Sequence, residues 1–479
     1  MLQVTALPAE AYFSKRRPKP NFPYFGLHQR RLLVPLLVVV VTVAVASLLS
    51  IISFHGLLKL SNTPPVQFVE SKLNTQFTPS NTLYLAENIS TNNKAAAGQT
   101  SMVHPPPSPP PPSLPLPPPP PTTDATGGPY HNWELFSADF NEMLTNLKIF
   151  VYPDVFTKKH SSPSAPIFLP HPNPLHPKLG NYYSEHMFKI ALLGSSLLTT
   201  NPEEAHFFFM PFSINALRND PRVRSEASIA NFVAQYTARI SWEYIFWNAS
   251  EGSDHFYVFC HSVGRDAASK HQSLYSNAIQ VTCSSSYFQR FYVSHKDVGL
   301  PQVWPRPPEE ALNPPDARNR LVFFAGRIQN SQVRQELVDT WANDTCMDIF
   351  SGNPPFPYEE GFRRSKYCLH VKGYEVNTAR ISDAIYYGCI PVIISNHYDL
   401  PFANVLDWSK FSVIISHRDI ALVKRILLSI SRQLYLRMHN NLCKIRRHFK
   451  WHTTPKGYDS FHMTAYQLWL RRGIHGLPY

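Results

Sequence analysis

The segment KYCLHVKGYEVNTARISDAIYYGCIPVIIS, residues 366–395, sets the pattern for the C-terminal part of this 479-residue chain. Its apolar runs at residues 366–373 and 390–395 are rich in β-branched and aromatic side chains, so they predict two buried strands. Between them, residues 379–388 carry apolar side chains at helical spacing. A strand, a helix and a second strand in this order predict a βαβ unit of a parallel sheet.

The same alternation of strand-like and helix-like segments extends in both directions from this unit. Residues 411–415 predict a further strand, followed by a helical pattern from about residue 419. Other strand-like runs occupy residues 147–152, 205–212, 255–260 and 320–326. Other helix-like runs occupy residues 183–198, 223–247 and 333–343. We therefore expect an α/β chain with two Rossmann-like halves, residues 130–310 and 311–479, that bind ligands in a cleft at the carboxyl ends of their strands. The proline-rich residues 303–315 are the expected connection.

Residues 32–54 form a run of 23 amino acids without a charge, which is long enough to span a membrane as a helix. A cleaved signal peptide is the alternative, but its apolar core is usually shorter, about 7–15 residues. Basic residues precede the run, so we expect a cytosolic tail at residues 1–31 and a luminal or extracellular remainder.

Residues 55–129 are expected to form a disordered stem. They are polar at first and then proline-rich, with 13 of the chain's 45 prolines between residues 105 and 121. Such a sequence is extended and semi-rigid and builds no core.

The net charge of +12 does not indicate nucleic-acid binding, because no basic stripe or nucleic-acid motif accompanies it beyond the N-terminal tail. The chain contains no P-loop, no G-x-G-x-x-G, no G-x-S-x-G and no H-E-x-x-H motif. It also contains no D-x-D, the usual carboxylate motif of metal-dependent sugar transfer. A site without a metal must neutralise a leaving diphosphate with cationic side chains and backbone N–H groups.

Six cysteines permit up to three disulfides. Cys368 and Cys389 lie in apolar, strand-like runs, where buried free thiols are at least as strongly expected. Three Asn-x-Ser/Thr sequons begin at Asn88, Asn248 and Asn343, and they fit a secretory compartment.

Polar residues at the centre of residues 366–395 are the first candidate site. Arg380, Asp383 and Tyr387 are spaced to share one helix face, and Asn377 or Thr378 can cap that helix. This arrangement suits a nucleotide sugar, with Arg380 on phosphate and Asp383 accepting from ribose hydroxyls. The alternative is a solvated Arg–Asp pair of little energetic consequence.

Residues 364–413 closely resemble the exostosin-like glycosyltransferases of family 47, plant members especially. The segments AHFFFMPFS, DHFYVFCH, RLVFFAGR and RRHF, which begin at residues 205, 254, 320 and 446, match that family in the same order. The resemblance runs from about residue 149 to residue 472. It implies a GT-B-like fold, a single-pass type II anchor in the Golgi membrane, and inverting transfer from a nucleotide sugar to a wall glycan. We expect a UDP-linked donor and a cell-wall polysaccharide or other glycan as acceptor. Because D-x-D is missing, we expect no metal, and no cofactor besides the donor substrate.

The resemblance also assigns residues to the two halves. Donor binding falls on Arg380, Asp383 and the loop residues Gly326, Arg327 and Gly373. The acceptor side, where an inverting enzyme needs one base, contains three candidates that the sequence does not separate: Asp254, His255 and His261. Each of these has a structural alternative, and Glu185 is a further competitor.

Three positions depart from the family pattern. Asp383 replaces a common Glu, Val371 replaces a proline, and Ser262 replaces an Asp that often follows the histidine. These departures motivate an alternative from another class, a non-catalytic scaffold subunit in a complex with other glycosyltransferases. A wall tether anchored by the polyproline is a third hypothesis. In the GT-B picture, the helical residues 461–472 cross back onto the first half.

Overall fold

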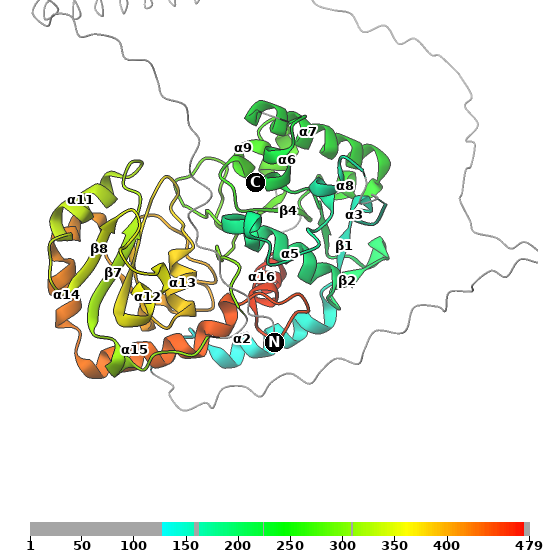
Figure 1. The fold of residues 1–479 in the computed structure, drawn as a ribbon. Coiled ribbons are helices and arrows are strands. Elements are labelled where there is room, and N and C mark those ends of the chain that lie inside the picture. Colours follow the sequence, from blue (N-terminus) through cyan, green and yellow to red (C-terminus); the bar gives the residue numbers. More distant parts are fainter. Residues whose placement is uncertain (1–126, 158–161, 224, 308–309, 474–479) are drawn as a thin grey trace, which may run out of the picture. The chain divides into compact units, whose positions relative to one another are not determined.

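The computed structural model describes residues 127–157, 162–223, 225–307 and 310–473, all within one compact unit (Figure 1). The predicted tail and anchor, and all but the last three residues of the predicted stem, lie outside the described residues. Within the described part, no helix combines the length and apolar character needed to cross a membrane.

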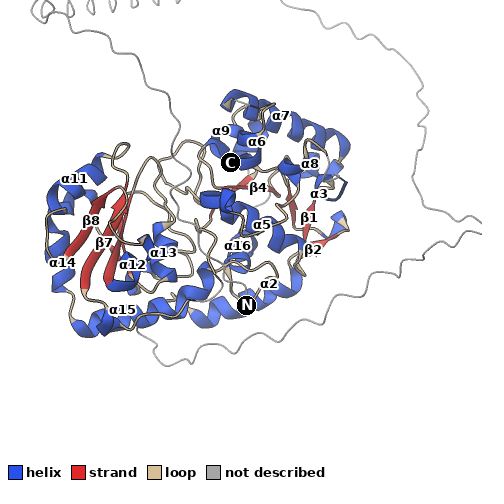
Figure 2. Ribbon diagram, in the orientation of Figure 1, coloured by secondary structure: helices blue, strands red, loops and turns tan. Residues whose placement is uncertain are grey.

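Two separate all-parallel sheets organise the chain, as the strand–helix alternation predicted (Figure 2). The first has the order β2-β1-β3-β4-β5-β6 and the second the order β11-β10-β9-β7-β8. The strands of the first sheet are β1 (Ile149–Val151), β2 (Leu198–Thr199), β3 (Phe207–Phe209), β4 (His255–Phe259), β5 (Ile279–Thr282) and β6 (Val298–Gly299). Those of the second are β7 (Arg320–Gly326), β8 (Met347–Ser351), β9 (Ser365–Val371), β10 (Ile390–Ile394) and β11 (Val413–Ile414).

Helices cover both faces of each sheet, which is why the central strands are apolar throughout: β3, β4 and β10 are buried at every position. The α-helices of the first half are α2 (Trp133–Asn146), α3 (Asp154–Thr157), α4 (Ala165–Phe168), α5 (Tyr183–Leu193), α6 (Ile214–Asn219), α7 (Glu226–Glu243), α8 (Ile245–Ser250), α9 (Val263–Ala267) and α10 (Gln272–Ser276). Those that follow are α11 (Gln332–Trp341), α12 (Tyr358–Arg364), α13 (Arg380–Tyr386), α14 (Val423–Ser429), α15 (Arg432–Ile445) and α16 (Ser460–Trp469).

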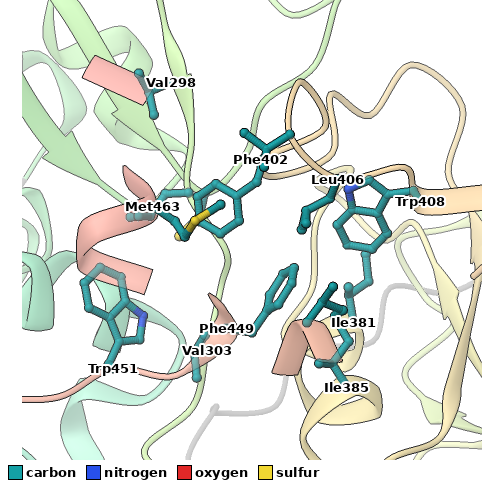
Figure 3. Close-up of a cluster of buried hydrophobic side chains, with 14 of the residues drawn as sticks. Val298, Val303, Ile381, Ile385, Phe402, Leu406, Trp408, Phe449, Trp451 and Met463 are labelled. Atoms are coloured by element: carbon teal, nitrogen blue, oxygen red, sulfur yellow. The ribbon is translucent and has the colours of Figure 1, made fainter. Parts of the chain in front are cut away.

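The two halves share one hydrophobic cluster. Figure 3 shows Phe402, Trp408 and Phe449 beside Ile381 of α13, with Val298 at the end of the first sheet in the same cluster. Helix α16 lies against α5 and β6 of the first half, which confirms the predicted return of the C-terminal helix. Packing of this kind fixes the carboxyl edges of the two sheets relative to each other.

One expectation was wrong. Residues 223–247 were expected to form one helix, but the chain is extended at Tyr244 and divides them between α7 and α8. The sequence left open whether Cys368 and Cys389 are bridged or free. They form a disulfide, because β9 and β10 are hydrogen-bonded neighbours and bring the two sulfurs together. A second disulfide joins Cys260 and Cys283, just after β4 and β5, while Cys346 and Cys443 are free.

Candidate functional site

A cavity of about 390 Å³ opens at the carboxyl ends of β7 and β9. After β7 the chain turns toward β8 on one side, whereas β9 pairs with β7 on the other, so this is the point where the strand order reverses. Ligands of doubly wound sheets bind at such a point. The lining consists of Arg327, Gln329, Asn330, Arg334, Gly373, Tyr374, Glu375, Asn377 and Thr378.

Arg334, near the start of α11, holds the two loops of the cavity together. Its guanidinium donates to the carbonyl of Val371 at 3.0 and 3.1 Å and to the carbonyl of Arg327 at 3.0 Å. A Cβ at position 373 would lie 2.7 Å from its Nη2, so Gly373 is needed for this close approach. Burial, together with the charge of Arg380, lowers the pKa of Arg334 to about 10.

Arg380 begins α13 directly beneath this cavity, but it is not among the residues that line it. Its Nε and Nη2 donate to the carbonyl of Ala325 at 3.1 and 2.7 Å, and the guanidinium lies 5.4 Å from the ring centre of Phe324. A side chain at Gly326 would collide with Nη2 of Arg380. Within the described residues, neither Arg380 nor Arg334 has a carboxylate partner. Burial raises the pKa of the Asp383 carboxyl group and Arg380 acts to lower it, but no carboxylate of the described residues forms an ion pair with either guanidinium. Two neighbouring cations without an ion-pair partner attract an anion.

Asp383, predicted to accept from a ribose, lies one turn further along α13 and is only 4% exposed. Its Oδ1 accepts from Nε and Nη2 of Arg306 at 3.1 and 2.7 Å. Burial raises the pKa of this carboxyl group, and Arg306 opposes that rise. Asp383 therefore forms a buried ion pair with Arg306 through Oδ1, not the solvated Arg–Asp pair of the alternative interpretation.

Asn377 supplies an unpaired buried polar group in the cavity wall. Its side chain is among the buried ones, and its Nδ2 donates to Oε1 of Gln302 at 2.9 Å. Its Oδ1 is buried and accepts no hydrogen bond from the described residues. A buried acceptor without a donor is costly, so the cavity favours a ligand with a hydroxyl or N–H at this position. Of the two predicted cap residues, Thr378 accepts a hydrogen bond from the Arg380 N–H at 3.3 Å, while the N-cap position itself is Ala379.

Glu375 connects the cavity to the first half of the chain. Its carboxylate accepts from Arg265 of α9 at 3.2 and 3.4 Å, from Ser284 at 2.5 Å and from Gln289 at 2.8 Å. Although burial acts to raise the pKa of Glu375, Arg265 and the hydrogen bonds lower it overall. The group is thus an ionised carboxylate, and it is the one acidic residue among those lining this cavity.

His261 follows β4 at the carboxyl edge of the first sheet, and its ring stacks on Tyr182 with centroids 5.2 Å apart. The backbone N–H of Val263 donates to its Nδ1 at 3.1 Å. A neutral imidazole whose Nδ1 accepts a hydrogen bond carries its proton on Nε2. Burial and the charge of Arg218 lower the pKa of His261 to about 4, with Glu375 opposing them. In this arrangement His261 is neutral and offers an Nε2–H donor, not a base.

Asp254 and His255 lie at the opposite, amino end of β4. His255 is fully buried; its Nδ1 is 2.6 Å from Oδ1 of Asp254, and its Nε2 is 2.7 Å from the hydroxyl of Tyr152. Both ring nitrogens are therefore engaged, and burial lowers the pKa of the ring. These contacts, at the end of β4 away from His261, favour a structural role for Asp254 and His255 over that of a base.

Glu185, the further competitor, is buried beneath that edge. Its Oε1 accepts from Oγ of Ser213 at 2.5 Å and from the backbone N–H of Asn215 at 3.4 Å, and its Oε2 accepts from the N–H of Cys260 at 3.3 Å. Burial raises the pKa of Glu185. Its carboxylate fills the place after β3 and β4 where a ligand anion would otherwise bind.

The sequence analysis did not identify Arg334 and Glu375 as residues of this cavity, and it considered Asn377 only as a helix cap. Arg334 lies within a predicted helix that follows a strand, a position that could have marked it as facing a ligand. The partners of Glu375 lie 86–110 residues away in the sequence, and no local pattern indicates them. Among residues 127–157, 162–223, 225–307 and 310–473, no group of three or more His, Cys, Asp or Glu side chains is arranged to hold a metal ion.

Comparison with known proteins agrees with this geometry. Residues 143–430 match the Exostosin GT47 domain. The chain is 34% identical over 361 residues to a probable glycosyltransferase of Arabidopsis thaliana, an overlap that covers 72% of this chain and 66% of that protein. A second Arabidopsis probable glycosyltransferase is 35% identical over 57% of this chain and 60% of its own length. A probable glucuronosyltransferase of Oryza sativa subsp. japonica is 27% identical over 64% of this chain and 78% of its own length. The chain thus spans about two thirds or less of the length of the two Arabidopsis relatives.

Proposed function

The chain belongs to the exostosin GT47 family of glycosyltransferases, and from this premise we propose that it transfers a sugar, with inversion, from a UDP-linked donor to a cell-wall polysaccharide or another glycan. The proposed location is the Golgi lumen, with residues 32–54 as a type II membrane anchor. Support for the location comes from the length and apolar character of that segment and from the sequons that follow it.

The observation that carries this proposal is the pair of arginines at the carboxyl edge of the second sheet that have no ion-pair partner among the described residues. The diphosphate of the donor binds above Arg334 and Arg380, and exposed Arg327 contributes a third cation at the rim. Positive charge held in place by backbone carbonyls stabilises the negative charge that develops on a leaving diphosphate. Asn377 then orients the donor by accepting a hydrogen bond from a hydroxyl or N–H group.

The acceptor binds against the first half, on the side of His261. Inverting transfer moves the proton of the attacking hydroxyl to a base while the bond from the anomeric carbon to the diphosphate breaks. We assign that proton to Glu375, because it is the acidic residue of the cavity lining and lies where the cavity meets Arg265 and Ser284 of the first half. The acceptor hydroxyl must then replace one of the present hydrogen-bond donors of this carboxylate, such as Ser284 or Gln289. The Nε2–H of His261 donates to a ligand oxygen, and no metal is needed.

Calorimetric titration of the purified full-length chain with UDP tests the donor site. We expect binding without added metal and unchanged by EDTA. The Arg380→Ala variant should bind at least tenfold more weakly, since a hydrogen bond to a charged group is worth about 1.5–3 kcal/mol. Undiminished affinity in that variant would contradict the assignment of Arg380.

A panel of UDP-sugars then tests the reaction. UDP-glucuronic acid belongs in the panel because relatives are named as probable glucuronosyltransferases. Release of UDP with any donor in the presence of a glycan acceptor supports the proposal. The scaffold hypothesis, motivated by Ser262 and by the Arg306–Asp383 ion pair, predicts instead no heat with any donor and co-purification with an active transferase.

A further inference from the structure

The corner between α7 and α8, at the edge of the first half, exposes two large apolar side chains (Figure 1). Trp242 is 90% exposed, the highest value for any large hydrophobic side chain in the described part of the chain, and Ile245 is 72% exposed. A single exposed apolar residue needs no explanation, but two within four residues at one corner place a large amount of apolar side chain in water.

Asn248 lies on this same corner. It is exposed, it follows Ile245 by three residues on α8, and residues three apart on a helix are neighbours. Its Nδ2 donates to the carbonyl of Ser241 at 2.8 Å, and Ser241 directly precedes Trp242 in the chain. The side-chain amide of Asn248 is therefore fixed next to the chain segment that carries both exposed apolar residues.

We infer that Asn248 carries an N-linked glycan whose first N-acetylglucosamine lies over Trp242 and Ile245. Asn248, Ala249 and Ser250 form an acceptor sequon. In the transfer, Nδ2 forms a bond to the anomeric carbon of the sugar, the bond from that carbon to the diphosphate of a lipid-linked oligosaccharide breaks, and the amide releases one proton. The amide keeps its second hydrogen, so the bond to Ser241 can persist.

The apolar C–H face of the sugar would cover the Trp242 ring, and its hydroxyls would face water. A large, rigid aromatic side chain supplies contact area at a low cost in conformational entropy. This explains why so exposed a tryptophan stands beside the sequon.

The other sequon in the described residues provides a matched control. Asn343 is also exposed and follows the end of α11. Its aromatic neighbour Trp341, however, is partly buried, with Nε1 donating to the carbonyl of Ile420 at 2.9 Å. A glycan at Asn343 would therefore not cover an exposed ring.

Expression of the full chain in a eukaryotic cell, with residues 32–54 as its own anchor, tests the inference, which rests on the luminal location of the proposed function. Glycopeptide mass spectrometry should show Asn248 occupied, with Asn248→Gln as the negative control. Asn248 without a glycan in this chain overturns the inference, whether or not Asn343 is modified.

Acrylamide quenching then tests the contact with Trp242. The intact protein is compared with a form trimmed to one N-acetylglucosamine and a form with the glycan removed; subtracting Trp242→Phe spectra isolates the emission of Trp242. We expect a several-fold increase in quenching on complete removal and little change on trimming. Equal quenching in all three forms overturns the proposed contact, and removal of a glycan from Asn343 alone should leave the Trp242 signal unchanged.

Discussion

The carboxyl edges of the two sheets have the same architecture and opposite electrostatic character. In the first sheet, the edge after β3 and β4 is filled by a carboxylate of the chain itself: Glu185 accepts from Ser213 and from the backbone N–H groups of Asn215 and Cys260. In the second sheet, the edge after β7 and β9 is an open cavity beside Arg334 and Arg380. Within the described residues, one edge holds an internal anion, whereas the other holds two cations that donate to backbone carbonyls and form no ion pair with a carboxylate.

Under the proposed function, this difference favours the second half as the nucleotide site. Backbone N–H groups at a helix N-terminus form an anion site whether the anion is a phosphate or a side chain. In the first half Glu185 already accepts from such groups, so we propose that the diphosphate binds to the second half and the acceptor to the first.

The two edges meet at Glu375. Its carboxylate belongs to the second half by sequence, yet its hydrogen-bond partners Arg265, Ser284 and Gln289 belong to the first. Under the proposed function, Glu375 lies next to both the donor site and the acceptor site. Its replacement should therefore affect the chemical step on the acceptor without removing the residues that bind the donor.

The largest effect is therefore expected from Glu375→Gln. The amide cannot accept the acceptor's proton, so kcat should fall by about 10²–10⁴. UDP affinity, measured by calorimetry, should change little, because Arg334 and Arg380 remain in place.

Arg265→Gln separates this catalytic role from a purely structural one. It removes the ion pair across the two halves but keeps the carboxylate, and it should cost much less in kcat than Glu375→Gln. Equal losses in the two variants would show that Glu375 only joins the halves.

The next largest effect is expected at Arg334. Arg334→Ala removes a cation and frees the carbonyls of Val371 and Arg327 at once, so UDP affinity should fall by about 10²-fold, or about 2.7 kcal/mol. Arg334→Lys keeps the charge but not the planar fork that bridges the two carbonyls, and it should restore only part of the affinity. Arg425→Ala, an exposed arginine on α14, is the control that should not alter the titration.

Glu185→Gln tests the same comparison in the first half of the chain. The NH2 group of the new amide would face either the hydroxyl of Ser213 or the N–H of Cys260, both of which now donate to the carboxylate. Lys189 would also lose its buried counter-charge. Denaturant titration should show a loss of about 3 kcal/mol in the free energy of unfolding, while UDP affinity per folded molecule stays unchanged. Loss of UDP affinity in the folded variant would contradict the assignment of the donor to the second half. Glu203→Gln, at an exposed position, is the matched control.

The sequence predicts the second half better than the first. Strands β7, β9 and β10 are long apolar runs, and the predicted ranges differ from the observed ones by at most two residues. Strand β5 was not predicted, because polar Gln280 interrupts its apolar pattern. That side chain is buried and donates to the carbonyl of Phe291 at 2.5 Å, a compensation that only the folded chain provides. The short strands β2, β6 and β8 were also missed.

Contacts between residues far apart in the sequence also limit prediction of the site. Gly373 and Arg327 line the cavity as the family motif indicated. The environment of Asp383 did not follow from the motif, since Arg306, 77 residues earlier, forms its ion pair. Likewise, the helix pattern around Asp383 contains nothing that distinguishes a buried carboxylate from one that faces a ligand.

The smallest effect concerns pH and the loop that carries Asn377. His370 of β9 supports this loop: its Nε2 lies 2.8 Å from the carbonyl of Val376 and its Nδ1 lies 2.9 Å from Oγ1 of Thr378. Burial lowers the pKa of His370 to about 3, well below its usual value of 6.5. Below about pH 6.5 the imidazole of His370 becomes protonated in the unfolded chain but stays neutral in the folded chain. The stability due to neutral His370 is therefore fully present above pH 6.5 and is lost as the pH falls toward 3, by about 1.4 kcal/mol per pH unit.

His370→Gln can retain both hydrogen bonds without titrating. Urea unfolding at pH 7.5, 6.0 and 5.0 should give a shallower fall in unfolding free energy for this variant, by up to the slope of one proton. Ile393→Val is the control, because it removes a buried methyl group at a cost of about 1 kcal/mol that does not depend on pH. A His370→Gln slope as steep as that of the unaltered chain would show that His370 is not kept neutral, and the tautomer that positions the cavity loop would then be wrong.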